Sequence, residues 1–230
     1  MTVIAQPPQR QSPVPTTSLT AAQRAAHCLR ERIVRAEIVP GARLGETELA
    51  RSLQVSRNSL REAFATLEAE RLVVRWRHRG VFVASPSRAE VAEMFRTRRA
   101  VQLSALRLGA DPADRLEELT RIASTITYGM TTAHASVLRE ASDELHALIG
   151  AQLGSEDLDE VLRSVLCRLR LVVPPIPAWV DLHLRAAERE AVLVHQMITG
   201  DRSGAHAVLG DYLNEAECIA LDVFTRSRAS

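Results

Sequence analysis

The feature that most constrains this chain is a pair of helical patterns joined by a tight turn, between positions 45 and 70. The second pattern repeats apolar residues at helical spacing, which commits one face of a helix to burial. These residues are Leu60, Ala63, Phe64 and Leu67. Ser56 comes directly before them, where a hydroxyl can accept an unpaired backbone N–H of the first turn. The sequence therefore predicts two packed helices with Val55 in the turn between them.

Two β-like stretches, residues 72–74 and 81–83, follow the helices and enclose a basic tip. The tip contains Arg75, Arg77, His78, Arg79 and Gly80. A strand, a tip turned by glycine and a returning strand form a hairpin. The helical pair alone would also fit an ordinary helical hairpin. Two helices followed by a basic hairpin instead indicate a winged helix–turn–helix, which predicts sequence-specific binding to a double-stranded DNA operator.

The second helix of such a unit presents the side chains of its N-terminal end to the bases. The candidate base-reading residues are Arg57, Asn58, Ser59 and Arg61, together with Thr47 of the first helix. In the hairpin, Arg77, Arg79 and Gly80 are the candidates for contact with the phosphate backbone or the minor groove. These eight residues form the predicted DNA-binding site.

Charge divides the chain in the same way. Residues 1–84 contain 13 Arg and 7 Glu, a balance of +6, whereas residues 85–230 have a balance of −5. The net charge of +1 therefore hides a basic front and an acidic back. A basic front suits attraction to phosphate whatever the sign of the rest.

The length and the patterns predict a mainly α protein with a tail and two domains. Residues 1–18 are rich in Pro, Gln, Ser and Thr, which predicts a disordered tail. Residues 19–84 form the predicted winged domain, which begins with a helix over 21–35. Residues 85–230 contain no strand pattern, so we expect an all-α bundle of six to seven helices.

Capping signals locate the helices of the second domain. Ser87 and Glu90 form a capping box before a helix that runs to about Leu108, and Asp111-Pro112 is expected to start another helix. Further helical patterns cover 133–152, 155–172, 178–199 and 202–227. The Pro-rich segment 174–177 breaks the chain between two of them.

Several classes of protein are excluded by what the sequence lacks. No apolar run reaches the roughly 20 residues that span a bilayer, and the N-terminus has no secretion-signal pattern. Cys28, Cys167 and Cys218 are odd in number and have no CxxC spacing, which favours a cytoplasmic location with core cysteines over a thiol redox sensor. No nucleophile elbow, phosphate loop or paired-carboxylate motif indicates an enzyme.

The front half resembles the GntR superfamily of bacterial transcription factors, specifically its FadR-like branch with an FCD effector domain. The matching motifs are residues 40–44 (PGARL), 48–50 (ELA), 55–57 (VSR), 60–63 (LREA), 67–73 (LEAERLV) and 79–83 (RGVFV). The resemblance implies that Arg57 and Arg61 contact the operator and that Gly80 turns the wing. Relatives usually have glycine where this chain has Gln54, which predicts a small shift of the turn.

The rear half resembles the effector-binding and dimerising domain of this branch. The matching segments are residues 98–101 (RRAV, followed by Gln102 where relatives have Glu), 145–146 (LH) and 198–201 (ITGD). The resemblance implies a homodimer that binds a small-molecule effector and represses transcription in its absence. The alternatives from other classes are an all-α metal-dependent enzyme domain fused to a DNA-binding module, and an architectural DNA-binding protein.

Many relatives hold a divalent metal ion through one Asp and three His. The corresponding positions in this chain are Ser142, His146, Glu190 and Tyr212, so one ligand of four is retained. Because neutral imidazoles are what suits Zn or Ni, no cofactor is expected. A weak divalent metal at His146 with Asp143 or Glu190 is the alternative, and a hydrogen-bonded bundle histidine is the simpler interpretation.

A domain that has lost the metal ion needs another cation to attract a carboxylate effector. Arg98 is the candidate for that cation, the alternative being an arginine of the surface or the dimer interface. The predicted effector site therefore consists of Arg98, His146, Glu190 and Tyr212.

Overall fold

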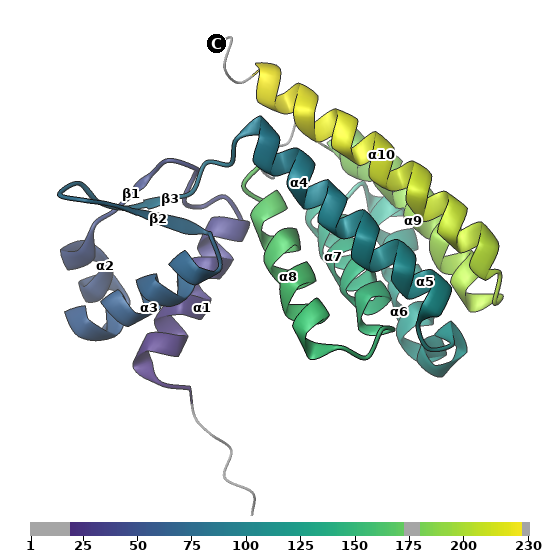
Figure 1. Cartoon of the computed structure of the whole chain (residues 1–230), viewed down its shortest axis with the longest axis horizontal. Coiled ribbons are helices and arrows are strands. Elements are labelled where there is room, and N and C mark those ends of the chain that lie inside the picture. The colour runs from purple at the N-terminus through teal and green to yellow at the C-terminus, as the bar shows by residue number, and fades with distance from the viewer. Residues whose placement is uncertain (1–18, 173–179, 227–230) are drawn as a thin grey trace, which may run out of the picture.

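The computed structural model describes residues 19–172 and 180–226, which form a small α/β lobe and a larger helical lobe (Figure 1). The predicted tail (1–18) and the Pro-rich break (174–177) lie outside the described residues. The fold is mainly α, with the winged domain and the helical bundle that the sequence predicts. Within the described ranges, every helix is too short or too polar to span a bilayer.

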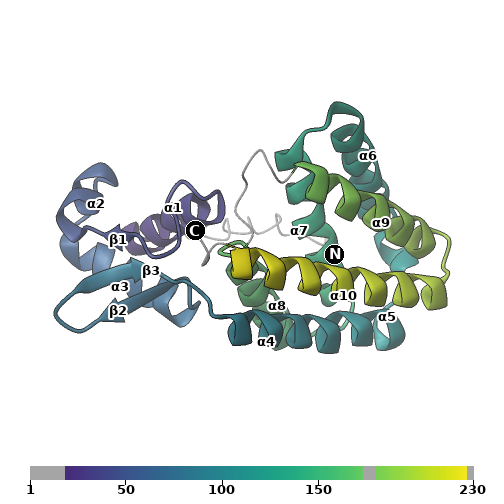
Figure 2. The same cartoon turned by 90° about the horizontal axis from the view of Figure 1, so that it is seen from above.

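The winged lobe contains three helices and a three-stranded antiparallel sheet of order β1-β3-β2. Its elements are α1 (Ala21–Val34), β1 (Arg43–Leu44), α2 (Glu46–Ser52), α3 (Arg57–Ala69), β2 (Val73–Trp76) and β3 (Gly80–Val83). The hairpin β2–β3 is the predicted wing, and both views place its tip far from the helical lobe (Figures 1 and 2). The strand β1 was not predicted, because it consists of two residues that pair with Phe82 and Val81.

Local capping explains where the winged helices begin. The Ser56 hydroxyl accepts the backbone N–H of Ser59 at 3.0 Å, which confirms the predicted cap of α3. Gln54 lies in the turn before it with a φ of 55°, in the left-handed region. That is the conformation for which glycine is usual, since it has no Cβ to clash. The turn thus accommodates Gln54 at a cost in backbone strain.

The helical lobe begins with the predicted capping box, in which Ser87 and Glu90 exchange hydrogen bonds of 2.7 and 3.3 Å. Its helices are α4 (Arg88–Arg98), α5 (Ser104–Leu108), α6 (Leu116–Thr132), α7 (Ala135–Ala151), α8 (Glu156–Leu169), α9 (Val180–Ile198) and α10 (Arg202–Arg226). A π-helical turn, Arg99–Leu103, joins α4 to α5, so the single helix expected up to Leu108 has an irregular middle.

One helix start differs from the prediction. Asp111-Pro112 was expected to open an α-helix, but Pro112–Arg115 is a 3₁₀ turn and α6 begins at Leu116. A proline fits the first turn of either kind of helix, because the backbone N–H groups of a first turn have no hydrogen-bond partner within the helix. The sequence signal therefore predicted the position of a helical turn correctly, but the turn is 3₁₀-helical and not α-helical.

Two hydrophobic cores lie side by side, and α8 connects them. The core of the winged lobe is built around Leu29, Phe64 and Leu72, whereas the bundle core contains residues from all of α4–α7, α9 and α10. Leu171, just after α8, is 5% exposed and belongs to the winged core. The α8 segment therefore contacts both lobes (Figure 1).

Candidate DNA-binding surface and effector cavity

The outer face of α3 presents most of the predicted base-reading residues. Arg57, Asn58 and Arg61 are exposed, as is Thr47 on α2. Ser59 is half-buried, and both its amide and its hydroxyl contact the Ser56 hydroxyl, the latter at 2.9 Å. Ser59 therefore takes part in the helix cap, which the sequence pattern did not distinguish from an outward contact.

Both arginines of this face are held toward α2. Arg57 Nη2 donates to Thr47 Oγ1 at 3.3 Å, and Arg61 Nε donates to Glu46 Oε2 at 3.1 Å. A guanidinium carries five N–H donors, so each arginine keeps most of them free for a nucleic acid. The contacts are exposed and weak, so they orient the side chains without committing them.

The wing offers a second cationic surface. Arg77 and Arg79 are exposed in the turn between β2 and β3, and the Arg79 guanidinium lies 5.2 Å from the centre of the Trp76 ring. Gly80 has a φ of 104°, which only glycine adopts without strain. The side chain of Arg43 on β1 lies beside Gly80 and adds a cation that the sequence pattern missed, because the β1–β3 pairing was not predicted.

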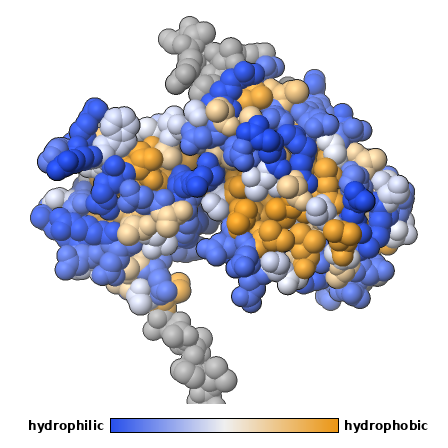
Figure 3. Space-filling view, in the orientation of Figure 1, coloured by the Kyte–Doolittle hydropathy of each residue, from blue (hydrophilic) through white to orange (hydrophobic). Residues whose placement is uncertain are grey.

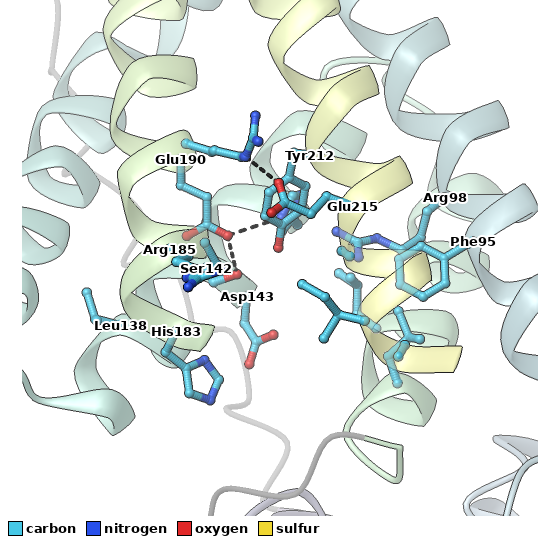
Figure 4. Close-up of a pocket in the computed structure, with 18 of the residues that line it drawn as sticks. Phe95, Arg98, Leu138, Ser142, Asp143, His183, Arg185, Glu190, Tyr212 and Glu215 are labelled. Carbon is cyan, nitrogen blue, oxygen red and sulfur yellow. Dashed lines mark hydrogen bonds and ion pairs between the residues drawn. The ribbon is translucent and has the colours of Figure 1, made fainter. Parts of the chain in front are cut away.

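The four predicted effector residues line one cavity of about 120 Å³ in the helical lobe (Figure 4). Arg98 comes from α4, His146 from α7, Glu190 from α9 and Tyr212 from α10. Four helices distant in the sequence thus bring together the residues expected to meet. Whether they bind an effector stays a prediction.

Arg98 is buried, with 4% of its surface exposed. Its guanidinium carbon lies 5.6 Å from the Phe95 ring centre and 5.8 Å from that of Tyr212. Arg98 Nε donates to Gln102 Oε1 at 3.2 Å, whereas Nη2 has no hydrogen-bond partner among the described residues. The alternative of a surface arginine is therefore wrong, because Arg98 is buried and lines the cavity.

A hydrogen-bond network fixes His146. Gln102 Nε2 donates to the His146 carbonyl at 2.9 Å and lies 3.1 Å from Nδ1, so Nδ1 accepts and the ring proton is on Nε2. That nitrogen lies 3.4 Å from Glu190 Oε1, which also accepts from Ser142 Oγ at 2.6 Å. Gln102, which replaces the glutamate of relatives, was missed as a site residue although it stands one helical turn after Arg98.

Burial keeps the aromatic donors of the cavity neutral. Desolvation, and then the nearby Arg98 charge, lower the pKa of His146, so the imidazole is uncharged at neutral pH. Desolvation and the Glu190 carboxylate raise the pKa of Tyr212. Arg98 stays charged although burial lowers its pKa, because a guanidinium does not lose its proton in a protein.

The residues present do not fit a divalent metal ion. Across the part of the chain that the structure describes, no three His, Cys, Asp or Glu side chains are grouped to hold one. Asp143, the alternative second ligand, forms an ion pair with Arg170. His146 Nδ1 is taken by Gln102, and a single imidazole with one carboxylate is a poor set of ligands for Zn or Ni.

The α8 segment separates the cavity from a groove of about 800 Å³ between the lobes. Leu166, Arg170 and Asp143 line both spaces. Cys167 also lines the groove, and both Cys167 and Leu171 pack against the winged core. The α8 segment and the Asp143–Arg170 ion pair therefore lie between the cavity and the winged lobe.

The comparisons with known proteins agree with this geometry. Residues 21–83 match the model of the bacterial regulatory proteins of the gntR family. An HTH-type transcriptional regulator of Bacillus subtilis is 36% identical over 92 residues, which are 40% of this chain and only 41% of that protein. The Nta operon transcriptional regulator of Aminobacter aminovorans is 26% identical over 165 residues, 71% of this chain and 76% of that protein.

Solved structures extend the likeness to both lobes. A GntR transcriptional regulator from Rhodococcus sp. RHA1 superposes with a TM-score of 0.80 at 28% identity, covering 87% of this chain and 97% of that one. The FCD domain of another regulator matches 62% of this chain and 99% of its own, with a TM-score of 0.54 and 19% identity, a likeness of fold alone. The matched proteins are regulators of transcription, not enzymes.

Proposed function

Since the chain is a GntR-family transcriptional regulator with a C-terminal FCD-like helical domain, we propose that it represses its target operator until a small carboxylate effector occupies the helical domain. The observation that carries the proposal is the pairing of two surfaces in one chain. An exposed cationic face lies on one lobe, and the other lobe contains a cavity with a buried arginine whose Nη2 has no hydrogen-bond partner among the described residues.

Recognition of the operator is assigned to α3 and the wing. Arg57, Asn58 and Arg61 would read base edges in the major groove, where an arginine contacts guanine through two N–H groups. Thr47 supports this face by accepting from Arg57, and Ser59 does so through the helix cap. The wing residues Arg77, Arg79 and Gly80 would follow the phosphate backbone.

Recognition of the effector is assigned to Arg98, with His146, Glu190 and Tyr212 as neutral or acceptor groups around it. A buried guanidinium with an unsatisfied N–H attracts a carboxylate, with which it forms charge-assisted hydrogen bonds. Because the residues do not fit a metal ion, the cation that receives the effector is a side chain.

The α8 segment would transmit binding to the winged lobe. Arg170 follows α8 and Asp143 lies on α7, and their ion pair lines both the cavity and the interlobe groove. An effector that shifts this pair would shift the Leu171 contact with the winged core. The effector would change the affinity for the operator only if it binds more tightly to one relative placement of the two lobes than to another.

The active form is proposed to be a homodimer, because one winged domain reads few bases and a twofold dimer reads two half-sites. An apolar patch over α4, α5 and α8 supports this (Figure 3). The exposed apolar side chains of α5 and α8 include Leu108, Leu158 and Val161. Contiguous apolar patches of this kind mark contacts between proteins. The expected operator is therefore a palindrome.

The test is selection of DNA from random sequences by the full chain, followed by a metabolite screen. We expect one palindromic sequence to be enriched and a carboxylate to release it. A ligand present at 100 times its dissociation constant adds roughly 2.7 kcal/mol to the free energy of unfolding, which a thermal-shift screen detects. Enrichment of no sequence would indicate an architectural DNA-binding protein and would overturn the proposal.

A further inference from the structure

We propose that the cavity of the helical domain binds an amphoteric ligand, one that carries a carboxylate and a protonated amine on a small apolar body. An α-amino acid is the simplest molecule of this class. The inference rests on the proposed effector-binding function and specifies the chemistry of the ligand. It follows from two buried and opposite charges that the described residues leave without ion partners.

The first charge is the guanidinium of Arg98. No described aspartate or glutamate forms an ion pair with it, and its Nη2 has no acceptor. Its neighbours are the Phe95 ring, the ring and hydroxyl of Tyr212 and the amide oxygen of Gln102. A buried cation with 4% of its surface exposed is costly, because the Glu190 charge offsets its desolvation only in part. A carboxylate in the cavity would supply an adjacent anion.

The second charge is the carboxylate of Glu190, which is 1% exposed. Its contacts are the hydroxyls of Ser142 and Tyr212 and the imidazole of His146, which burial keeps neutral. Within the described ranges no arginine pairs with Glu190. A protonated amine has three N–H donors and a positive charge, and both suit a buried carboxylate.

The two charges are separated across the cavity. Arg98 extends from α4 and Glu190 from α9, and Tyr212 of α10 lies between them in Figure 4. The other acidic lining residues are already paired, Asp143 with Arg170 and Glu215 with Arg189. A simple carboxylate would satisfy Arg98 but leave Glu190 unpaired, and a simple amine would do the reverse. A ligand with both groups would place its carboxylate beside Arg98 and its amine beside Glu190.

The rest of the lining limits the body of the ligand. A cavity of about 120 Å³ has room for several water molecules or one small metabolite. Its apolar lining residues include Phe95, Leu138, Leu169 and Ala216. These side chains favour an apolar substituent over a sugar or a phosphate.

The test compares matched ligands on the full chain. The standard L-α-amino acids are screened by thermal shift, each beside its deaminated acid and its decarboxylated amine, for example leucine with isocaproate and isoamylamine. We expect at least one amino acid to raise the melting temperature by more than both of its analogues. If carboxylates bind and no amino acid binds better, this inference fails while the proposed carboxylate effector stands. If no amino acid stabilises the chain, this inference fails as well.

Two variants assign the amine to Glu190. In Glu190→Gln, the dissociation constant of the amino acid should rise about tenfold or more, whereas that of its deaminated acid should change little. Glu215→Gln is the matched control, because it removes a lining carboxylate that already pairs with Arg189, and it should keep the preference for the amino acid. An equal loss of preference in both variants, or no loss in Glu190→Gln, would overturn the assignment.

Discussion

At the scale of single residues, exposure separates two uses of arginine in this chain. Arg57 and Arg61 are exposed and only loosely tied to neighbours on α2, so they remain available to a large anionic partner. Arg98 is enclosed by aromatic rings, where only a small ligand could reach it. In the proposed function, the same type of side chain would bind a polyanion on one lobe and a small metabolite in the other.

The recognition arginines give the first prediction of this scale. Arg57→Ala and Arg61→Ala should each weaken binding to the selected operator at least tenfold, because a bidentate contact to guanine is worth about 1–3 kcal/mol. Gel-shift titration measures the affinity, and the melting temperature should not fall, since both side chains are exposed. Arg115→Ala, an exposed arginine of the helical lobe, is the control and should bind normally. Normal binding by both recognition variants would show that α3 does not read the operator.

The strained turn at Gln54 gives the second prediction at this scale. Gln54→Gly should raise the free energy of unfolding by somewhat less than about 1 kcal/mol. The glycine removes the cost of roughly 1–2 kcal/mol that a side chain pays in the left-handed conformation. The greater conformational entropy of glycine in the unfolded chain cancels part of this gain. Urea titration measures the change. Glu48→Gly, at an exposed helical position of α2, should instead lower stability by about 1 kcal/mol. A loss of stability in Gln54→Gly would mean that the turn does not need this conformation.

The sequence could name the four cavity residues but not their exposure. Motif positions identified Arg98, His146, Glu190 and Tyr212 as neighbours, and they line one cavity. The pattern around Arg98 left burial open, because a π-helical turn follows it and interrupts the helical period. The role of Gln102 could not be predicted either, because its hydrogen-bond partner His146 lies 44 positions away in the sequence.

At the scale of elements, signals within a few residues were sufficient for most helices. Ser56 and Ser87 begin helices as predicted, because a cap depends on the three residues that follow it. The strand β1 escaped prediction, because two residues carry no alternation and form a strand only by pairing with β3. Local sequence determines an element when its stabilising contacts are local.

The wing gives the prediction at this scale. Removing both cations in Arg77→Ala with Arg79→Ala should reduce the slope of log affinity against log salt by about two units, near 0.9 for each phosphate that the wing no longer neutralises. Measuring operator binding over a range of salt concentrations gives the slope. The double variant Arg96→Ala with Arg115→Ala removes the same charge from the helical lobe and should leave the slope unchanged. Equal slopes for the wing variant and the unmodified chain would remove the wing from the interface.

At the scale of the whole molecule, the contact between the lobes depends on residues that no motif identified. Arg139 Nη1 donates to the carbonyl of Val34 at the end of α1, at 3.0 Å, and Ser164 Oγ donates to the carbonyl of Glu70 at 3.4 Å. Each contact joins positions 94 or more residues apart, so no periodic pattern could reveal it. Both lie beside the groove or on α8, the segment proposed to transmit effector binding.

Leu171 offers the sharpest test of that connection, because it belongs to the winged core although it follows a helix of the other lobe. Leu171→Ala should cost about 2–5 kcal/mol, as for other fully buried leucines, and should lower the melting temperature of the winged lobe by roughly 10 °C or more. Differential scanning calorimetry should then show two transitions further apart than in the unmodified chain. Leu116→Ala, at an exposed position of α6, removes the same atoms and should change little. If Leu171→Ala melts like the control, α8 does not hold the lobes together, and an effector in the cavity would need another route to the operator.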